Sequence, residues 1–266
     1  MFQPLYVAAT GLNAFQDDIL SLTNNLANAQ TTGFKKSRSE MESLFYIPKS
    51  FKDELAGALQ SLDEVPAVSP EFGTGVRVVA TPKDFSQGSL QSSSNALDLA
   101  IQGSGFFKVK MPDGTLAYTR AGNFHADNEG NLVDANGHIL SDSIVFPSGV
   151  SNVVIQQDGT VLVTVGSDLT YTSIGQISLS KFGNPSGLKS LGQNLFTETE
   201  ASGAEISGNA ADENFGTINQ YNLEASNVDV ISEMMRMVVI QRVFDTLTKA
   251  VNSYEGMLTS LSQMKS

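Results

Sequence analysis

The sequence of 266 residues contains no cysteine, no tryptophan and only two histidines. The absence of cysteine excludes disulfide bonds, thiolate metal sites and cysteine nucleophiles. Only 17% of the residues are charged, and acidic residues outnumber basic ones 28 to 16. A nucleic-acid-binding surface needs clustered Lys and Arg, so the composition argues against a nucleic-acid partner. Hydrophobic residues make up 41% of the chain, which is enough to build a core.

Long apolar runs are missing as well. No stretch of 18 apolar residues occurs, so we expect no membrane span. The first Lys is Lys35, and Asp17 and Asp18 interrupt the apolar residues near the N-terminus. A cleavable signal peptide begins with a basic region and continues with an unbroken apolar one, and this pattern does not fit it. If the protein leaves the cytoplasm, we expect a route that reads no cleavable signal.

Residues for catalysis or cofactor binding are equally sparse. His125 and His138 flank turns and have no His-x-x-x-His companion for zinc. Residues 103–105 do not form a nucleophile elbow, and residues 73–75 do not form a phosphate-binding loop. Residues 127–130 resemble a calcium loop, but His125 would then occupy the first ligand position, which favours a plain turn. The sequence therefore predicts no enzyme, no cofactor and no metal.

Apolar residues near the N-terminus recur at alternating steps of three and four. This heptad pattern predicts a helix of about 25 residues with one apolar stripe. Thr32 and Gly33 are expected to end the helix, because Gly tolerates the left-handed conformation. Lys35 and Lys36 then lie where cations favour the negative end of the helix dipole. The stripe consists of Leu5, Ala8, Leu12, Phe15, Ile19, Leu22, Leu26 and Ala29.

The C-terminus repeats the same heptad pattern. Ser226 and Asn227, with Asp229, are typical of a helix N-terminal cap. The stripe consists of Met237, Ile240, Phe244, Leu247, Val251, Tyr254, Leu258 and Leu261. Further apolar residues widen this face beyond what a two-helix pair needs, namely Ile231, Met234, Met235, Val238 and Val239.

Two interpretations of these helices remain open. They could form an intramolecular hairpin within an ordinary core, or they could form a coiled-coil layer shared between subunits. The terminal placement of the stripes and the few Glu–Lys pairs on the polar faces favour packing between subunits.

The central part of the chain is rich in Gly, Ser, Asn, Thr and Val. Turn dipeptides at 113–114, 129–130, 136–137 and 158–159 separate short apolar or alternating runs at 105–110, 115–120, 153–155 and 160–165. This spacing predicts a mainly antiparallel β domain. The expected fold class is α+β, with segments 1–45 (helix and turn), 46–72 (extended), 73–225 (β domain) and 226–266 (helix).

The segment 46–72 fits neither pattern. Pro48, Pro66 and Pro70 enclose a short amphipathic stretch at residues 51–62. It could be a surface loop or an arm that contacts a neighbouring subunit.

Three separated blocks of the sequence form a further pattern. Residues 24–38 read NNLANAQTTGFKKSR and contain the signature residues Asn24, Asn25, Asn28, Gly33, Phe34 and Lys35. The second block comprises residues 73–77, 85–88, 97–107 and 112–120, and the third comprises 224–230 with 241–242 and 249–250. Together the three blocks resemble the bacterial flagellar rod and hook proteins, and within that family the chain is most similar to the distal rod type. The proximal rod type and the hook subunit remain alternatives.

The resemblance implies a structural subunit that polymerises helically into a hollow, torque-transmitting shaft crossing the periplasm. The terminal stripes would be its assembly interface. Its partners would be copies of itself, other rod and hook proteins, the surrounding ring proteins and the flagellar type III export apparatus.

Two interpretations from other functional classes also remain. One is a monomeric binding module, with the β domain gripping a glycan or a protein and the helices as a stalk. The other is a hydrolase whose acidic residues are brought together only by folding.

Overall fold

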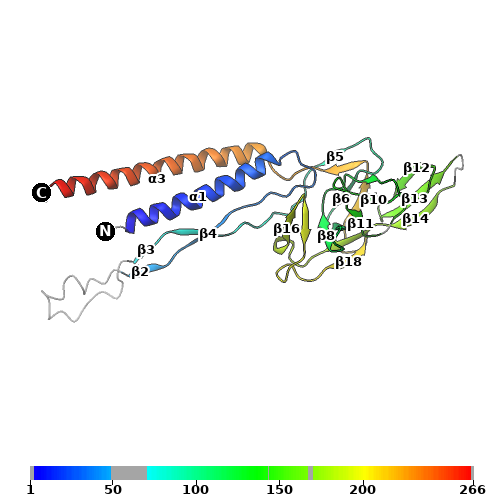
Figure 1. Ribbon diagram of the computed structural model, residues 1–266, viewed down its shortest axis with the longest axis horizontal. Coiled ribbons are helices and arrows are strands. Elements are labelled where there is room, and N and C mark those ends of the chain that lie inside the picture. The colour runs from blue at the N-terminus through cyan, green and yellow to red at the C-terminus, as the bar shows by residue number, and fades with distance from the viewer. Residues whose placement is uncertain (1–2, 49–70, 143, 167–169, 265–266) are drawn as a thin grey trace. The chain divides into compact units, whose positions relative to one another are not determined.

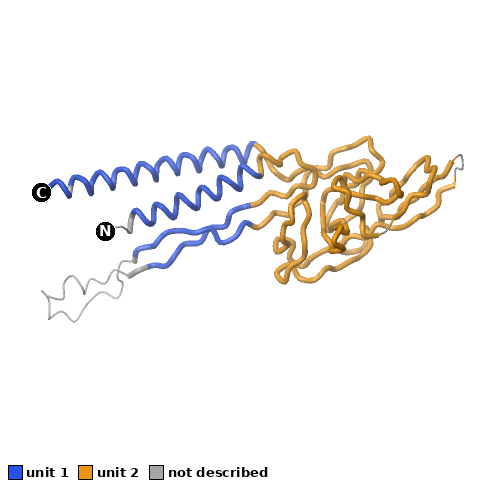
Figure 2. Tube along the Cα trace, viewed as in Figure 1, with its two compact units in different colours: residues 1–24, 38–81, 231–266 blue, residues 25–37, 82–230 orange. Residues whose placement is uncertain are grey.

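The computed structural model describes residues 3–48, 71–142, 144–166 and 170–264, which belong to two compact units (Figures 1 and 2). Unit 1 contains residues 1–24, 38–81 and 231–266, and unit 2 contains residues 25–37 and 82–230. The chain therefore crosses between the units at four places, and neither unit is one continuous segment of sequence. The four segments expected from the sequence remain a proposal about independent domains.

Both predicted terminal helices are present, namely α1 (Gln3–Ala27) and α3 (Val230–Met264). Helix α1 has the expected length but ends at Ala27, so Ala29 lies in the following turn. Gly33, with φ of +69°, adopts the left-handed conformation predicted for it. Ser226 and Asn227 lie too early to cap α3, which begins at Val230, and the Asn227 amide binds backbone groups of a loop in unit 2. Asp229, the third residue of the predicted cap, directly precedes the helix, and its role in the cap stays a prediction.

In unit 1, α1 and α3 run antiparallel side by side (Figure 1). A methyl group on Gly11 would lie 3.6 Å from Leu247 Cδ1, so the two helices approach closely where α1 has no side chain. Further along, Arg236 Nη2 donates to both carboxylate oxygens of Asp18 at 3.0 Å. The α+β class with mainly antiparallel sheets and two terminal helices is confirmed, whereas a coiled-coil layer between subunits remains a proposal.

Unit 1 also contains a two-stranded ribbon. Strand β1 (Glu40–Ser43) pairs with β4 (Val76–Ala80), and β2 (Tyr46–Pro48) pairs with β3 (Glu71–Gly73), both antiparallel. The two ends of the predicted segment 46–72 belong to this ribbon, and its amphipathic stretch at 51–62 lies outside the described residues.

The ribbon meets helix α1 at a glycine. Gly75, with φ of +126°, leaves room for the Thr10 hydroxyl, which a Cβ at position 75 would displace. Val76 N donates to that hydroxyl at 3.4 Å.

Unit 2 is built from antiparallel strands, as predicted. Its largest sheet has the order β16-β17-β8-β7-β11-β10-β9, with β15 pairing β7 and β18; a second sheet has the order β12-β13-β14, and β6 pairs β19 while β5 pairs β20. The strand bounds are β5 Leu90–Ser92, β6 Leu99–Gln102, β7 Phe106–Lys110, β8 Leu116–Thr119, β9 His125–Ala126, β10 Leu132–Val133, β11 Ile139–Leu140, β12 Val150–Ile155, β13 Thr160–Val165, β14 Thr172–Gln176, β15 Ser178–Lys181, β16 Lys189–Gly192, β17 Leu195–Thr197, β18 Ile206–Asn209, β19 Thr217–Gln220 and β20 Asn222–Glu224.

The four predicted turns of unit 2 contain glycines with positive φ, which only Gly adopts at little cost. Two of these turns have the same surroundings. The Gly130 carbonyl accepts the Phe146 N–H at 2.7 Å, and the Gly159 carbonyl accepts the Ile177 N–H at 2.8 Å. A Cβ at either glycine would lie 2.4 Å from that partner's carbonyl oxygen. These two turns are therefore packed against neighbouring backbone of the β domain.

Two hydrophobic clusters stabilise unit 2. The larger cluster includes Leu99, Phe107, Phe124 and Leu179, all at most 1% exposed. The smaller cluster is aromatic, and Phe106, Phe182 and Phe196 form its centre. Edge-to-face ring contacts stabilise this cluster. The ring centroids of Tyr118 and Phe182, for example, lie 4.7 Å apart.

Candidate functional site

The predicted C-terminal stripe is the inner face of α3. From Met237 onward, the stripe includes every α3 residue with a described side chain that is not exposed. Ile240 is buried at 5% exposure, and the remaining stripe residues with described side chains are half-buried. Leu261 lies near the end of α3, and the structure describes only the backbone of this residue. Half-buried apolar side chains retain surface that a further partner could cover.

The N-terminal stripe lies slightly to one side of the buried face of α1. Leu22 is buried at 1% exposure, whereas Leu5, Leu12, Phe15, Ile19 and Leu26 are half-buried. The buried line runs through Gly11, Ala14 and Asp18, each one position before a stripe residue. Helix α1 contacts α3 through Gly11 and the ribbon through Thr10, so neighbouring segments cover it on two sides.

A second apolar surface covers the outer side of the first turns of α3. It consists of Ile231, Met234, Met235, Val238 and Val239, which are 48–70% exposed, and is called the outer patch below. At 3.6 residues per turn, Ile231 and Val238 lie opposite the inner stripe. Further along the same side most residues are polar, for example Arg242, Lys249 and Ser253, although Met257 is also exposed. The clustered apolar residues of the outer patch therefore lie at the beginning of the helix.

The signature residues from Asn25 to Lys35 form a different structure, which lies in unit 2, whereas Asn24 belongs to unit 1. Asn25 is buried, and its side chain accepts the Ser37 N–H at 2.9 Å and donates to the Ser37 carbonyl at 2.8 Å. Gly33 N donates to the Glu224 carbonyl at 2.8 Å. A Cβ at Gly33 would lie 2.5 Å from Ala121 N, so only glycine fits against this backbone.

Lys35 is the centre of this structure. Its ammonium group donates to Glu224 Oε1 at 2.6 Å and to the Ser86 carbonyl at 2.7 Å, and both charged side chains are fully buried. Glu224 Oε1 also accepts the Gly88 N–H at 2.9 Å, and Glu224 Oε2 lies 3.4 Å from Arg120 Nη1. We call Asn25, Lys35, Arg120, Glu224 and Asn227 the clasp.

The remaining signature residues, Asn24, Asn28 and Phe34, are not part of the clasp. Phe34 is buried and packs under Lys83, whose Nζ lies 5.1 Å from the ring centroid. Asn28 accepts the Thr31 hydroxyl at 3.2 Å in the turn after α1. Asn24 is exposed on the last turn of α1. The sequence identified the signature but did not indicate that Lys35 would be buried or that Glu224 would be its partner.

Burial sets the electrostatics of the clasp. Desolvation lowers the pKa of Lys35 below its usual 10.5, although the Glu224 carboxylate acts in the opposite direction. Desolvation also lowers the pKa of Arg120, again against the effect of Glu224. Arg120 Nε is buried with no hydrogen-bond partner among the described groups. Two cations thus share one carboxylate.

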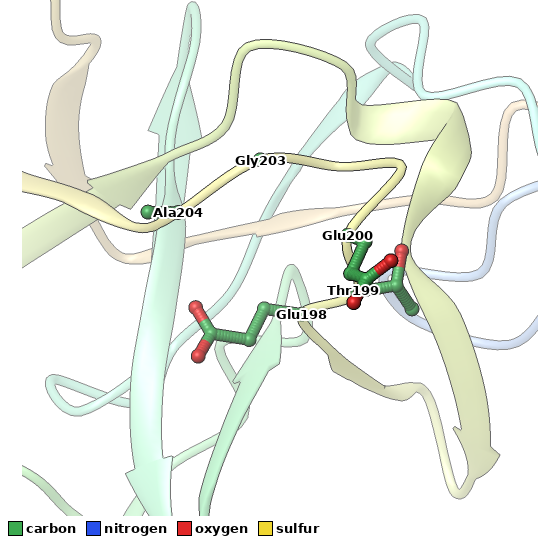
Figure 3. A pocket seen from close by; sticks show the side chains of 5 residues that line it. All are labelled: Glu198, Thr199, Glu200, Gly203 and Ala204. Atoms are coloured by element: carbon green, nitrogen blue, oxygen red, sulfur yellow. The ribbon is translucent and has the colours of Figure 1, made fainter.

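Other polar groups of unit 2 are engaged in local structure. His138 Nδ1 lies 2.9 Å from Asp134 Oδ2, and both residues are buried at a turn. A shallow, open hollow of about 500 Å³ is lined by Glu198, Thr199, Glu200, Gly203 and Ala204, and Glu198 points away from Glu200 (Figure 3). This hollow therefore offers no pair of converging carboxylates for hydrolysis.

Within the described residues, no three His, Cys, Asp or Glu side chains gather as a metal site would require. The same described part of the chain contains no helix with the length and hydropathy of a membrane span.

Three family profiles match separate parts of the chain. The flagella basal body rod protein profile matches residues 5–35, the flagellar hook protein FlgE/F/G D1 domain matches residues 100–163, and the flagellar basal body rod FlgEFG protein C-terminal profile matches residues 219–264.

Whole-chain relatives agree with these profiles. The flagellar basal-body rod protein FlgG of Buchnera aphidicola (from Schizaphis graminum) is 40% identical over 264 residues, which is 99% of this chain and 100% of the relative. The protein of the same name from Borreliella burgdorferi is 38% identical over 100% of this chain and 99% of the relative. That of Bacillus subtilis is 34% identical over the full length of both.

Proposed function

The chain belongs to the family of flagellar basal-body rod proteins and is a structural subunit of the distal rod, and we propose that it builds this rod by helical self-association through its terminal helices. The relatives are structural rod proteins and not enzymes, and the family associates with itself and with other rod and hook proteins of the basal body. In the proposal, one copy contacts the next through a surface that does not close into a ring, which generates a hollow helical tube.

The observation that carries the proposal is the apolar surface of unit 1. Residues in the outer patch, such as Ile231 at 70% exposure, face away from the inner stripe of α3. Soluble monomers rarely expose a contiguous apolar patch of this kind without a partner. The inner stripes themselves, from Leu5 to Leu26 and from Met237 to Leu261, are the rest of the proposed assembly interface.

The same proposal includes several finer features. The tube would cross the periplasm and transmit torque inside the surrounding ring proteins, and the subunit would reach it through the flagellar type III apparatus without a cleavable signal peptide. Segment 46–72 would contact a neighbouring subunit and stiffen the tube. Deletion of residues 49–70 followed by measurement of filament bending tests the last point, because unchanged stiffness would contradict it.

A charge placed in the outer patch tests self-association. Met235→Asp should abolish filament formation, because a desolvated carboxylate in an apolar contact costs several kcal/mol. Ser253 lies on the same side of α3 about five turns further along and outside the outer patch, so Ser253→Asp is the matched control. Filaments are followed by light scattering and electron microscopy of the concentrated protein, and circular dichroism verifies that both variants are folded.

Loss of filaments in Met235→Asp but not in Ser253→Asp supports the proposal. A wild-type chain that stays monomeric at high concentration, as a binding module would, contradicts it. Equal filament formation by both variants would show that the outer patch is not part of the interface. Leu258→Asp tests the inner stripe in the same way and should also block incorporation while unit 2 stays folded.

A further inference from the structure

The clasp joins all four places where the chain enters or leaves unit 2. Asn25 links the first crossing, between residues 24 and 25, to Ser37 at the second. Asp84 N donates to the Lys36 carbonyl at 2.9 Å, which links the second crossing to the third, between residues 81 and 82. The fourth crossing lies between residues 230 and 231, shortly after Asn227. Asn227 accepts the Lys36 N–H at 2.8 Å and donates to the Asp84 carbonyl at 2.8 Å, which links this crossing to the second and the third.

Lys35 and Glu224 lie in the interior of these links. Lys35 reaches the third crossing through the Ser86 carbonyl and the fourth through the Glu224 carboxylate. Glu224 also binds Gly88 N, and a Cβ at Gly88 would lie 1.9 Å from the Ala225 carbonyl oxygen. The loop at residues 84–88 and the segment at 224–227 therefore touch closely, and the side chains of the ion pair beside them are fully buried.

A buried ion pair of this kind is poorly explained by stability alone. Its desolvation offsets much of the attraction, and apolar side chains of similar size often stabilise such a site equally well. In some proteins, however, a buried polar pair selects one arrangement of the segments that carry it. A single arrangement of the chain segments is important at the clasp, because α1 ends and α3 begins close to it in the sequence.

We propose that Lys35 and Glu224 are positioning residues for self-association, which hold the four chain crossings of unit 2 in a single arrangement. This proposal rests on the proposed function, because it is the terminal helices that the crossings prepare for assembly. The family signature is then a motif for internal positioning and not a contact surface between subunits.

The charge balance of the clasp gives the proposal a specific consequence. Lys35 and Arg120 share the single carboxylate of Glu224. Removal of the Lys35 charge leaves Arg120 and Glu224 balanced, whereas removal of the Glu224 charge leaves two buried cations without an anion. Glu224→Gln should therefore open the clasp much more than Lys35→Met does, and Lys35→Met should partly rescue Glu224→Gln.

Hydrogen exchange of the full chain at a dilute, monomeric concentration measures this opening. The reporters are peptides that contain the clasp amides of Gly33, Lys36 and Gly88, and the references are peptides from β7 and β8. In Glu224→Gln, exchange of the reporters should accelerate about tenfold or more relative to the references. In Lys35→Met the acceleration should be about threefold or less, and the double variant should lie between the two single variants.

The matched control is another ion pair of unit 2 that touches no crossing. Lys108 Nζ lies 2.7 Å from Glu205 Oε1, and both side chains are mostly buried. Lys108→Met should accelerate exchange of the β7 and β8 references and leave the clasp reporters unchanged. Equal acceleration of hydrogen exchange in reporters and references of Glu224→Gln would show that the clasp only stabilises unit 2 as a whole. That result would overturn the proposal. Equal effects of Lys35→Met and Glu224→Gln would also overturn it.

Filament formation by the same variants tests the role in assembly. Glu224→Gln should assemble at least about tenfold more slowly than wild type, with partial recovery in the double variant. Normal assembly by Glu224→Gln with an opened clasp would contradict a positioning role. A wild-type chain that never forms filaments would overturn the proposed function. The exchange experiment uses monomer, so its result for the clasp could still be interpreted in that case.

Discussion

Lys35 Nζ lies 2.6 Å from Glu224 Oε1 although the two residues are 189 positions apart, and neither side chain is exposed to solvent. The contact unites the beginning and the end of unit 2. Because a lysine loses its hydration on burial, this position requires the carboxylate to be in place. The folded state of unit 2 thus depends on Glu224, which lies in the last segment of this unit.

The backbone around Gly33 predicts a sharp difference between two glycine variants. Gly33 and Gly137 both have positive φ, but only at Gly33 would a Cβ collide with neighbouring backbone. We expect Gly137→Ala to cost about 1 kcal/mol through strain alone, and Gly33→Ala about 3 kcal/mol or more through strain and overpacking. Thermal unfolding measures both variants, and equal melting temperatures would contradict the packing of Gly33 against Ala121.

The ion pair between Asp18 and Arg236 predicts a specific loss in unit 1. Asp18 is buried, and Arg236 is its partner on α3. Asp18→Asn should destabilise the helix pair by about 1 kcal/mol, a value reduced because Arg236 is partly exposed. Asp17→Asn at the exposed neighbouring position is the control and should have no effect. Urea unfolding followed by the helical circular dichroism signal decides the matter, and identical midpoints would contradict the role of Asp18.

The hydrogen bonds to Glu205 predict a pH dependence. Burial alone would raise the pKa of Glu205, but hydrogen bonds from Lys108, Ser180 and Tyr118 lower the pKa below its usual 4.5. The folded state therefore binds this proton more weakly than the unfolded state. Its contribution to stability is fully present above about pH 4.5 and is lost as the pH falls through the lowered pKa.

We accordingly expect Glu205→Gln to melt at a lower temperature than wild type at pH 7. Its melting temperature should fall less steeply than that of wild type between about pH 5 and about pH 3. Glu200→Gln, at an exposed carboxylate, is the control and should follow the wild-type curve. Parallel curves for Glu205→Gln and wild type would exclude a stabilising role for the Glu205 hydrogen bonds.

The terminal helices should be the least protected part of the free subunit. The outer patch and the half-buried stripes leave α1 and α3 with less covered apolar surface than the β core of unit 2. We expect amides of residues 3–30 and 230–262 to exchange rapidly in dilute monomer and slowly in filaments. This would keep subunits from associating prematurely. Strong protection of both helices at micromolar concentration would contradict the expectation.

The local sequence pattern was sufficient to predict the helices and several of the strands. Heptad spacing predicted both helices, and the stripe from Met237 to Leu258 is the inner face of α3 as the structure has it. Turn dipeptides predicted the turns of the β domain and the strands between them, and glycines with positive φ lie in these turns. These features depend on residues a few positions apart, whose effects on the backbone act before any distant contact forms.

The sequence alone determined the helices, the β domain and, through its resemblance, the family. Only the tertiary structure decided that the buried line of α1 runs through Gly11, Ala14 and Asp18, that Asn227 binds the loop at residues 84–86, and that Lys35 is buried against Glu224. Each of these contacts joins segments far apart in the chain. Periodicity records which face of an element is apolar, but the identity of its neighbour is set only when distant segments pack together.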